Sequence, residues 1–66
     1  MTNHLKLARV KQDLTQEQLA AQVGVSRQSI NSIEKNRYVP SALLALKIAR
    51  ALHTTVNDLF ELEESD

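Results

Sequence analysis

Hydrophobic side chains recur every three or four residues along most of the chain, which is the spacing of one face of an α-helix. The first such segment covers about residues 3–12, with Leu5 and Ala8 on its inner face. Thr2 or Asn3 is the expected N-cap, because a short polar side chain before the first hydrophobic position commonly begins a helix. The chain is therefore expected to open with an amphipathic helix.

A second helix is marked at both of its ends. Thr15 and Gln18 have the spacing of a capping box, in which each side chain accepts a hydrogen bond from the other residue's backbone N–H. Leu19 and Val23 follow at helical spacing. Gly24, the only glycine of the chain, is expected to end this helix in the left-handed conformation.

The remaining segments continue the helical pattern. Ser26 is the expected N-cap of a third helix at about residues 27–35, whose inner face carries Ile30 and Ile33. Asn36 is the expected left-handed stop of that helix.

Two more helices are predicted after a loop that ends at Pro40. Ser41 is the expected cap of a fourth helix at about residues 42–52, and Thr55 opens a short fifth one that ends near Phe60. The predicted fold class is therefore all-α, a compact five-helix bundle in a single small domain.

Composition excludes several kinds of site. The 66 residues contain no cysteine, which rules out disulfides and thiolate metal sites. His4 and His53 are far apart in the sequence and have no carboxylate at ligand spacing, so we expect neither a metal nor a cofactor. No apolar run approaches the roughly 20 residues of a membrane span, and no signal peptide is recognisable, so a cytoplasmic protein is expected.

The zero net charge conceals an uneven distribution. Residues 1–60 hold all eight Lys and Arg but only four acids, a balance of +4, whereas residues 61–66 hold the other four acids. We therefore divide the chain into a basic body, 1–60, and an acidic C-terminal tail, 61–66. The tail is either a solvated terminus that adds solubility or a segment that binds a partner protein.

Residues 15–36 have the arrangement of a helix-turn-helix unit, with two short helices joined by a tight turn that contains glycine. In such units the second helix lies in the DNA major groove and presents its N-terminal residues to the bases. Its outward positions here carry side chains that pair well with guanine or adenine, and no acid precedes Glu34. These positions are Arg27, Gln28, Asn31 and Ser32.

Three runs of the sequence resemble the phage repressor/Cro family of XRE-type regulators. They are residues 15–20 (TQEQLA), 23–30 (VGVSRQSI) and 33–41 (IEKNRYVPS), and the similarity extends to Leu52 and to residues 59–60. The resemblance covers nearly the whole chain. It implies a five-helix fold, in which the second and third helices bind DNA, and a function in binding operator DNA as a dimer.

The resemblance also implies roles for individual residues. Arg27 and Gln28 match the main base-reading positions, with Asn31 and Ser32 beside them. Gln16 matches a glutamine that contacts a phosphate and braces the first side chain of the recognition helix. The full set expected at the phosphate backbone is Gln16, Ser26, Lys35, Asn36, Arg37 and Tyr38. For Tyr38 an equally good alternative is that its ring covers the edge of the core.

Other matching positions concern structure rather than DNA. Arg9 and Glu34 correspond to an ion pair that joins the first helix to the end of the third. Asp13, Asn36 and His53 stand where the family usually has glycine, and asparagine tolerates the left-handed conformation better than most residues.

The fourth predicted helix is apolar nearly all round, with Lys47 and Arg50 as its only polar residues. Such a helix needs burial on more than one side, which a symmetric homodimer would provide. The expected dimer surface consists of Leu43, Leu46, Phe60 and Leu62. The alternative is scattered surface leucine, which is common on monomers.

Together these features predict a sequence-specific transcriptional regulator, a repressor that binds palindromic operator DNA as a homodimer. The alternative is an antitoxin-like interaction module whose acidic tail binds a partner protein. We do not expect an enzyme, because the sequence has no nucleophile–base pair, metal cluster or phosphate-binding glycine loop.

Overall fold

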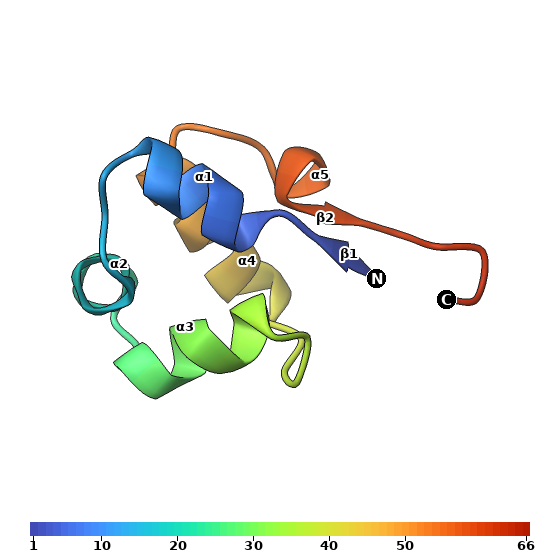
Figure 1. The fold of residues 1–66 in the computed structure, drawn as a ribbon, viewed down its shortest axis with the longest axis horizontal. Coiled ribbons are helices and arrows are strands. Elements are labelled where there is room, and N and C mark those ends of the chain that lie inside the picture. Colours follow the sequence, from blue (N-terminus) through green and yellow to red (C-terminus); the bar gives the residue numbers. More distant parts are fainter.

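Five helices and two very short strands follow one another in the computed structural model, which describes all residues 1–66 (Figure 1). The elements are β1 (Thr2–Asn3), α1 (Leu5–Lys11), α2 (Gln16–Val23), α3 (Arg27–Glu34), α4 (Ala42–Ala51), α5 (Val56–Leu59) and β2 (Phe60–Glu61). The five predicted helices are confirmed, and their ends differ from the prediction by one or two residues, as helix ends commonly do. None of the helices is long and apolar enough to cross a membrane.

Four helices begin at a side-chain cap, which explains why their starts were predictable. The Thr15 Oγ1 accepts the Gln18 N–H at 3.0 Å, and the Gln18 Oε1 accepts the Thr15 N–H at 2.9 Å, so the predicted capping box is present. The same cap, in which the hydroxyl accepts the N–H three residues later, is made by Ser26, Ser41 and Thr55. Each cap satisfies one of the backbone donors that a helix start leaves without a partner.

A two-stranded antiparallel sheet joins the two ends of the chain and was not predicted. Thr2 lies opposite Glu61, and Asn3 lies opposite Phe60. Strands of two residues are too short to show an alternating pattern, and this pairing connects positions almost a whole chain apart. The sheet places Glu61, which we had expected to begin a separate tail, next to the N-terminal segment.

The expected N-cap of α1 at Thr2 or Asn3 was wrong, because both residues are in β1. The helix begins at Leu5 after His4, whose side chain makes no capping hydrogen bond. The His4 N–H instead donates to the Leu59 carbonyl at 2.8 Å, which holds the entering chain against the end of α5. Asn3 still helps the helix start, since its Oδ1 accepts the Leu5 N–H at 2.8 Å.

Acidic residues after β2 lie against the N-terminus. The Thr2 hydroxyl donates to a Glu63 carboxylate oxygen at 2.9 Å, and the Met1 amine lies 2.9 Å from an Asp66 oxygen. A hydrogen bond from the Glu63 backbone N–H lowers the pKa of the Asp66 carboxyl, and the hydrogen bond to Asp66 raises the pKa of the Met1 amine.

Residues from all five helices form one hydrophobic core. Eleven buried side chains pack together, namely Leu5, Leu19, Ala20, Val23, Ile30, Ile33, Leu44, Ile48, Ala49, Leu52 and Leu59. Both isoleucines of α3 are completely buried, as their spacing predicted. Because these two anchor one face of α3 in the core, the opposite face of that helix is turned to solvent.

Four residues have a positive φ, and all follow the end of a helix or lie in the loop after it. They are Gly24 (77°), Asp13 (55°), Asn36 (58°) and His53 (55°). Asp13, Asn36 and His53 are the three positions at which the resemblance implied glycine. The left-handed conformation costs a residue with a side chain roughly 1–2 kcal/mol, and asparagine and aspartate tolerate it best. His53 is therefore the most strained of the three.

Candidate nucleic-acid interface

The turn between α2 and α3 is short and closely hydrogen-bonded. The N–H groups of Gly24 and Val25 both donate to the Ala20 carbonyl, at 2.9 and 3.0 Å, and Ser26 then begins α3 in an extended conformation. Figure 1 shows α2 end-on while α3 lies across the view at the lower edge of the molecule, so the two helices cross steeply. This is the geometry of a helix-turn-helix unit.

The four expected base-reading side chains are all on α3. Arg27 and Gln28, in its first turn, are exposed, and Asn31 and Ser32, one turn later, are half-buried. The arrangement places hydrogen-bonding groups of two successive turns on the side of α3 away from the core.

The loop after α3 is fastened to that helix. The Asn36 N–H donates to the Ile33 carbonyl at 3.0 Å, and the Arg37 N–H donates to the Ser32 carbonyl at 2.9 Å. With Asn36 in the left-handed conformation, this pattern closes the helix and directs the exposed Lys35 and Arg37 away from the core.

Tyr38 lies beside α3 rather than over the core. The side chain is exposed and is not among the residues that pack against the buried cluster. It borders a hollow of about 310 Å³ whose other lining residues are Ser26, Gln28, Ser29 and Ser32. The geometry therefore favours a role for Tyr38 at the surface of α3 over the alternative in which its ring covers the core.

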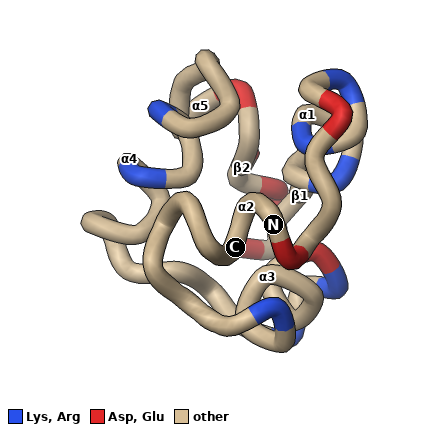
Figure 2. The backbone as a smooth tube through the Cα atoms, turned by 90° about the vertical axis from the view of Figure 1, so that its left-hand side faces the viewer, with Lys and Arg blue, Asp and Glu red and all other residues tan.

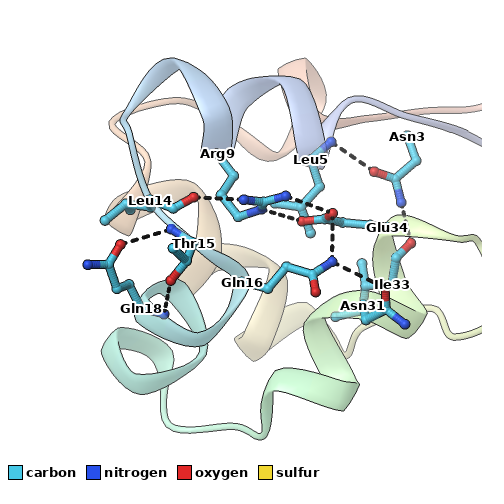
Figure 3. A network of polar contacts seen from close by, with 10 residues as sticks. All are labelled: Asn3, Leu5, Arg9, Leu14, Thr15, Gln16, Gln18, Asn31, Ile33 and Glu34. Atoms are coloured by element: carbon cyan, nitrogen blue, oxygen red, sulfur yellow. Dashed lines mark hydrogen bonds and ion pairs between the residues drawn. The ribbon is translucent and has the colours of Figure 1, made fainter.

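A buried ion pair fixes the C-terminal end of α3 to α1 (Figure 3). The Arg9 Nε and Nη2 donate to the two carboxylate oxygens of Glu34, at 2.7 and 3.2 Å, and Nη1 donates to the Leu14 carbonyl at 2.7 Å. The ion pair that the resemblance implied is thus present in the structure. It also neutralises the one acid of α3.

Gln16 extends this network to Asn31 of α3. Its Nε2 donates to the Asn31 Oδ1 at 3.2 Å and to the Glu34 Oε1 at 3.1 Å (Figure 3). The resemblance led us to expect a contact with the first side chain of the helix, whereas the structure has the contact one turn later. Asn31 and Glu34 are three residues apart, so both lie on the face of α3 that meets the start of α2.

Asn3 is a structural residue of the site that the sequence did not identify in this role. Its Nδ2 donates to the Ile33 carbonyl and lies 3.5 Å from the Asn36 Oδ1. These contacts tie β1 to the end of α3. Only its position as a polar residue before a helix was visible in the sequence, and that signal indicated a cap.

Basic side chains follow α3 and its loop. Figure 2 shows Lys and Arg positions on α3 and on the segment that follows it, at the bottom of the view. Arg27, Lys35 and Arg37 are exposed, and none of them forms an ion pair within the chain. Since Glu34 is paired with Arg9, this edge of the molecule offers a positive surface to a polyanion.

Of the four residues expected at a dimer surface, three are exposed. Leu43 and Leu46 are 65% and 60% exposed on α4, and Leu62 is 85% exposed after β2. Phe60 differs from these, because it is half-buried and packs against the core of its own chain. Leu43 and Leu46 line a hollow of about 520 Å³ together with Lys47 and Arg50.

Comparisons with known proteins agree with this geometry. The sequence model of the family described as helix-turn-helix matches residues 5–59. The chain is 47% identical over 66 residues to the helix-turn-helix-type transcriptional regulator YgzD of Bacillus subtilis, and equally to the regulator MJ0272 of Methanocaldococcus jannaschii. Both alignments cover all of each chain.

Solved structures give the same result. The restriction-modification controller protein C.AhdI from Aeromonas hydrophila superposes with a TM-score of 0.80 at 32% identity, over 86% of each chain. SinR in its complex with SinI gives a TM-score of 0.80 at 25% identity, over 94% of this chain and 66% of SinR.

Proposed function

The chain belongs to the XRE-type helix-turn-helix family of DNA-binding transcriptional regulators, and on that basis we propose that it binds a palindromic operator as a homodimer and represses transcription there. The family is a class of regulators rather than of enzymes. The observation that carries the proposal is the solvent-facing side of α3, where Arg27 and Gln28 stand at the helix start and the buried isoleucines fix the helix beneath them.

Sequence reading is assigned to two turns of α3. Arg27 suits a bidentate contact with guanine, and Gln28 suits one with adenine, each contributing about 1–3 kcal/mol of discrimination. We assign the neighbouring base pairs to Asn31 and Ser32. Exposure of the first two side chains supports this assignment.

Phosphate contacts would supply register and much of the affinity. We assign them to exposed groups that flank α3, namely Ser26, Lys35, Asn36, Arg37 and Tyr38. Gln16 is assigned a phosphate through its backbone N–H, because its side-chain nitrogen already donates to Asn31 and Glu34. That backbone group is the first of α2, a position without an acceptor inside the helix.

We assign dimerisation to the exposed leucines of α4, together with Leu62 and the part of Phe60 that the core leaves exposed. A two-fold dimer presents two copies of α3, which read half-sites one helical turn, about 34 Å, apart. A dimer bound over a promoter blocks polymerase, which is the simplest mechanism of repression. The protein would act in the cytoplasm, where its DNA target lies.

The test begins with a selection from a random DNA library, which yields the operator and its half-site spacing. Fluorescence anisotropy then compares the selected duplex with a scrambled one. We expect Arg27→Ala and Gln28→Ala to bind the two duplexes with equal affinity. Lys6→Ala, a charge change on the exposed surface of α1, should still bind the selected duplex more tightly. Equal affinity of the unchanged protein for both duplexes would contradict the proposal.

The exposed Leu62, flanked by acidic residues, favours a second candidate function as a protein-interaction module. The acidic segment would then bind a basic partner, as an antitoxin binds its toxin. A stoichiometric protein that co-purifies from the native host after nuclease treatment, and is lost in Leu62→Ser, would support this function. Purification without such a protein would contradict it.

A further inference from the structure

The outer face of α4 combines two exposed leucines with the only two charged residues of that helix. Leu43 and Leu46 each have a cation four residues later, Lys47 and Arg50 respectively, and the four side chains line one hollow. Both cations are exposed, and neither forms an ion pair within the chain. A complementary partner for this face therefore presents an apolar group together with negative charge.

Neither a second copy of α4 nor the exposed side of α1 has that composition. Because α4 contains no acid, a contact of α4 with its own copy would leave four cations without a carboxylate between them. The exposed apolar residues of α1, Leu7 and Val10, are accompanied by the exposed Lys6 and Lys11. Both surfaces thus have the same sign of charge as the outer face of α4.

The acidic C-terminal tail has the required composition. Leu62 is 85% exposed, more than any other large hydrophobic side chain of the protein. Its neighbours bond to the N-terminal segment of their own chain, since Glu61 lies 3.3 Å from the His4 Nε2 and Glu63 accepts from the Thr2 hydroxyl. Side chains alternate along an extended chain, so Leu62 projects to the opposite side from these two acids.

Glu64 supplies a free negative charge close to this leucine. Its side chain is exposed and forms no ion pair within the chain. Two residues of extended chain advance roughly 6.6 Å, and four residues of α-helix advance roughly 6 Å. The step from Leu62 to Glu64 therefore matches the step from a leucine of α4 to its cation. Figure 1 shows the tail running away from the helices after β2, where it is open to another molecule.

We propose that the acidic C-terminal tail of one copy docks on the outer face of α4 of a second copy, with Leu62 against the leucines and Glu64 against the cations. This inference rests on the proposed function, since it specifies the contact that forms the homodimer. A two-fold axis makes the contact twice, because each copy contributes one α4 face and one tail. The charges then determine which surfaces meet, while the leucines are removed from water.

The test exchanges the charges between the two surfaces. An α4 variant combines Lys47→Glu with Arg50→Glu, and a tail variant carries Glu64→Lys, which leaves the contacts of Glu61 and Glu63 in place. Alone, each variant brings like charges together at both contacts of its dimer. We expect the dissociation constant of either homodimer, measured by sedimentation velocity over a concentration series, to rise by at least about tenfold.

An equimolar mixture of the two variants should form dimers again. One contact of the mixed dimer then has its charges exchanged, and the other is that of the unchanged protein, so opposite charges meet at both. We expect native mass spectrometry to show dimers that contain one copy of each variant, at concentrations where either variant alone is a monomer.

The matched control places the same change of charge on α1. Lys6→Glu combined with Lys11→Glu should dimerise like the unchanged protein, since both lysines are exposed and lie outside the proposed contact. A mixture of this control with the tail variant should contain no more mixed dimer than the subunit dissociation constants of the two homodimers predict. Circular dichroism verifies that every variant is folded.

Three results would overturn the inference while leaving the proposed function in place. One is a tail variant that dimerises as tightly as the unchanged protein. Another is an α4 variant that does so. The third is a mixture of folded variants that remains monomeric, because the exchanged charges then do not face each other. If the unchanged protein is a monomer both free and on its selected operator, the homodimer of the proposed function fails, and this inference fails with it.

Discussion

Arg9 and Glu34 meet side by side, with Nε 2.7 Å from Oε2 and Nη2 3.2 Å from Oε1, and their side chains are only 10% and 4% exposed. Both charges have thus lost most of their hydration and depend on each other for compensation. Removal of one partner leaves a buried charge without its counter-ion. The resulting loss of folding free energy is far larger than the net stabilisation that the intact pair provides.

The first prediction concerns this pair. Arg9→Met and Glu34→Met should each lower the free energy of unfolding by about 3–5 kcal/mol, which is comparable to the whole stability of many small domains. Urea denaturation followed by circular dichroism measures the change. The double variant should be more stable than either single one, because no unpaired charge remains. A double variant in which the two losses simply add would contradict this explanation.

The parts of the fold that were predictable are those that local chemistry determines. The hydroxyls of Thr15, Ser26 and Ser41 cap helices within three residues of themselves, so their effect is visible in a short window of sequence. The buried spacing of Ile30 and Ile33 is equally local, and it fixes which face of α3 is exposed.

The features that were missed depend on contacts between distant segments. β1 forms only because residues 60–61 return to it, and Asn3 is bonded to Ile33, thirty positions away. The preference of Gln16 for Asn31 over the first turn of α3 depends on the exact crossing of two helices. The spacing of hydrophobic residues along the chain carries no information about such contacts. The roles of the α3 side chains toward DNA remain predictions.

The second prediction concerns His53, which has φ 55° at the end of α4. His53→Gly should raise the free energy of unfolding by about 0.5–1 kcal/mol, because relief of the left-handed strain exceeds the added chain entropy of glycine. For a domain of this size, that is a rise in melting temperature of roughly 2–8 °C. His53→Ala is the control and should give no such gain, since alanine keeps the strain. An equal gain from both variants would show that the histidine side chain, rather than φ, is unfavourable.

The third prediction separates affinity from specificity. Lys35→Ala and Arg37→Ala should weaken binding to selected and scrambled duplexes by similar factors, because a phosphate contact carries no base information. Each should also reduce the slope of log affinity against log salt by about 1. Anisotropy titrations at several salt concentrations measure both quantities. If a variant instead changes the ratio of the affinities for the two duplexes, the substituted residue reads bases.

The last prediction concerns Leu46, which is 60% exposed on the outer side of α4. Leu46→Glu should leave the fold intact, because the buried face of the helix is formed by other residues such as Leu44 and Ile48. A charge in the proposed interface should nevertheless prevent association, since it would be desolvated there without a partner. Sedimentation velocity should therefore report a monomer at concentrations where the unchanged protein is a dimer.

The same variant should also lose the advantage of a full palindrome over a single half-site, because two linked reading helices bind more tightly than one. Leu7→Glu on α1 is the matched control, since Leu7 is 58% exposed and lies outside the proposed surface. It should remain dimeric and keep the preference for the palindrome. If Leu46→Glu behaves like this control, the dimer contact does not involve the outer face of α4, and its exposed leucines are ordinary monomer surface.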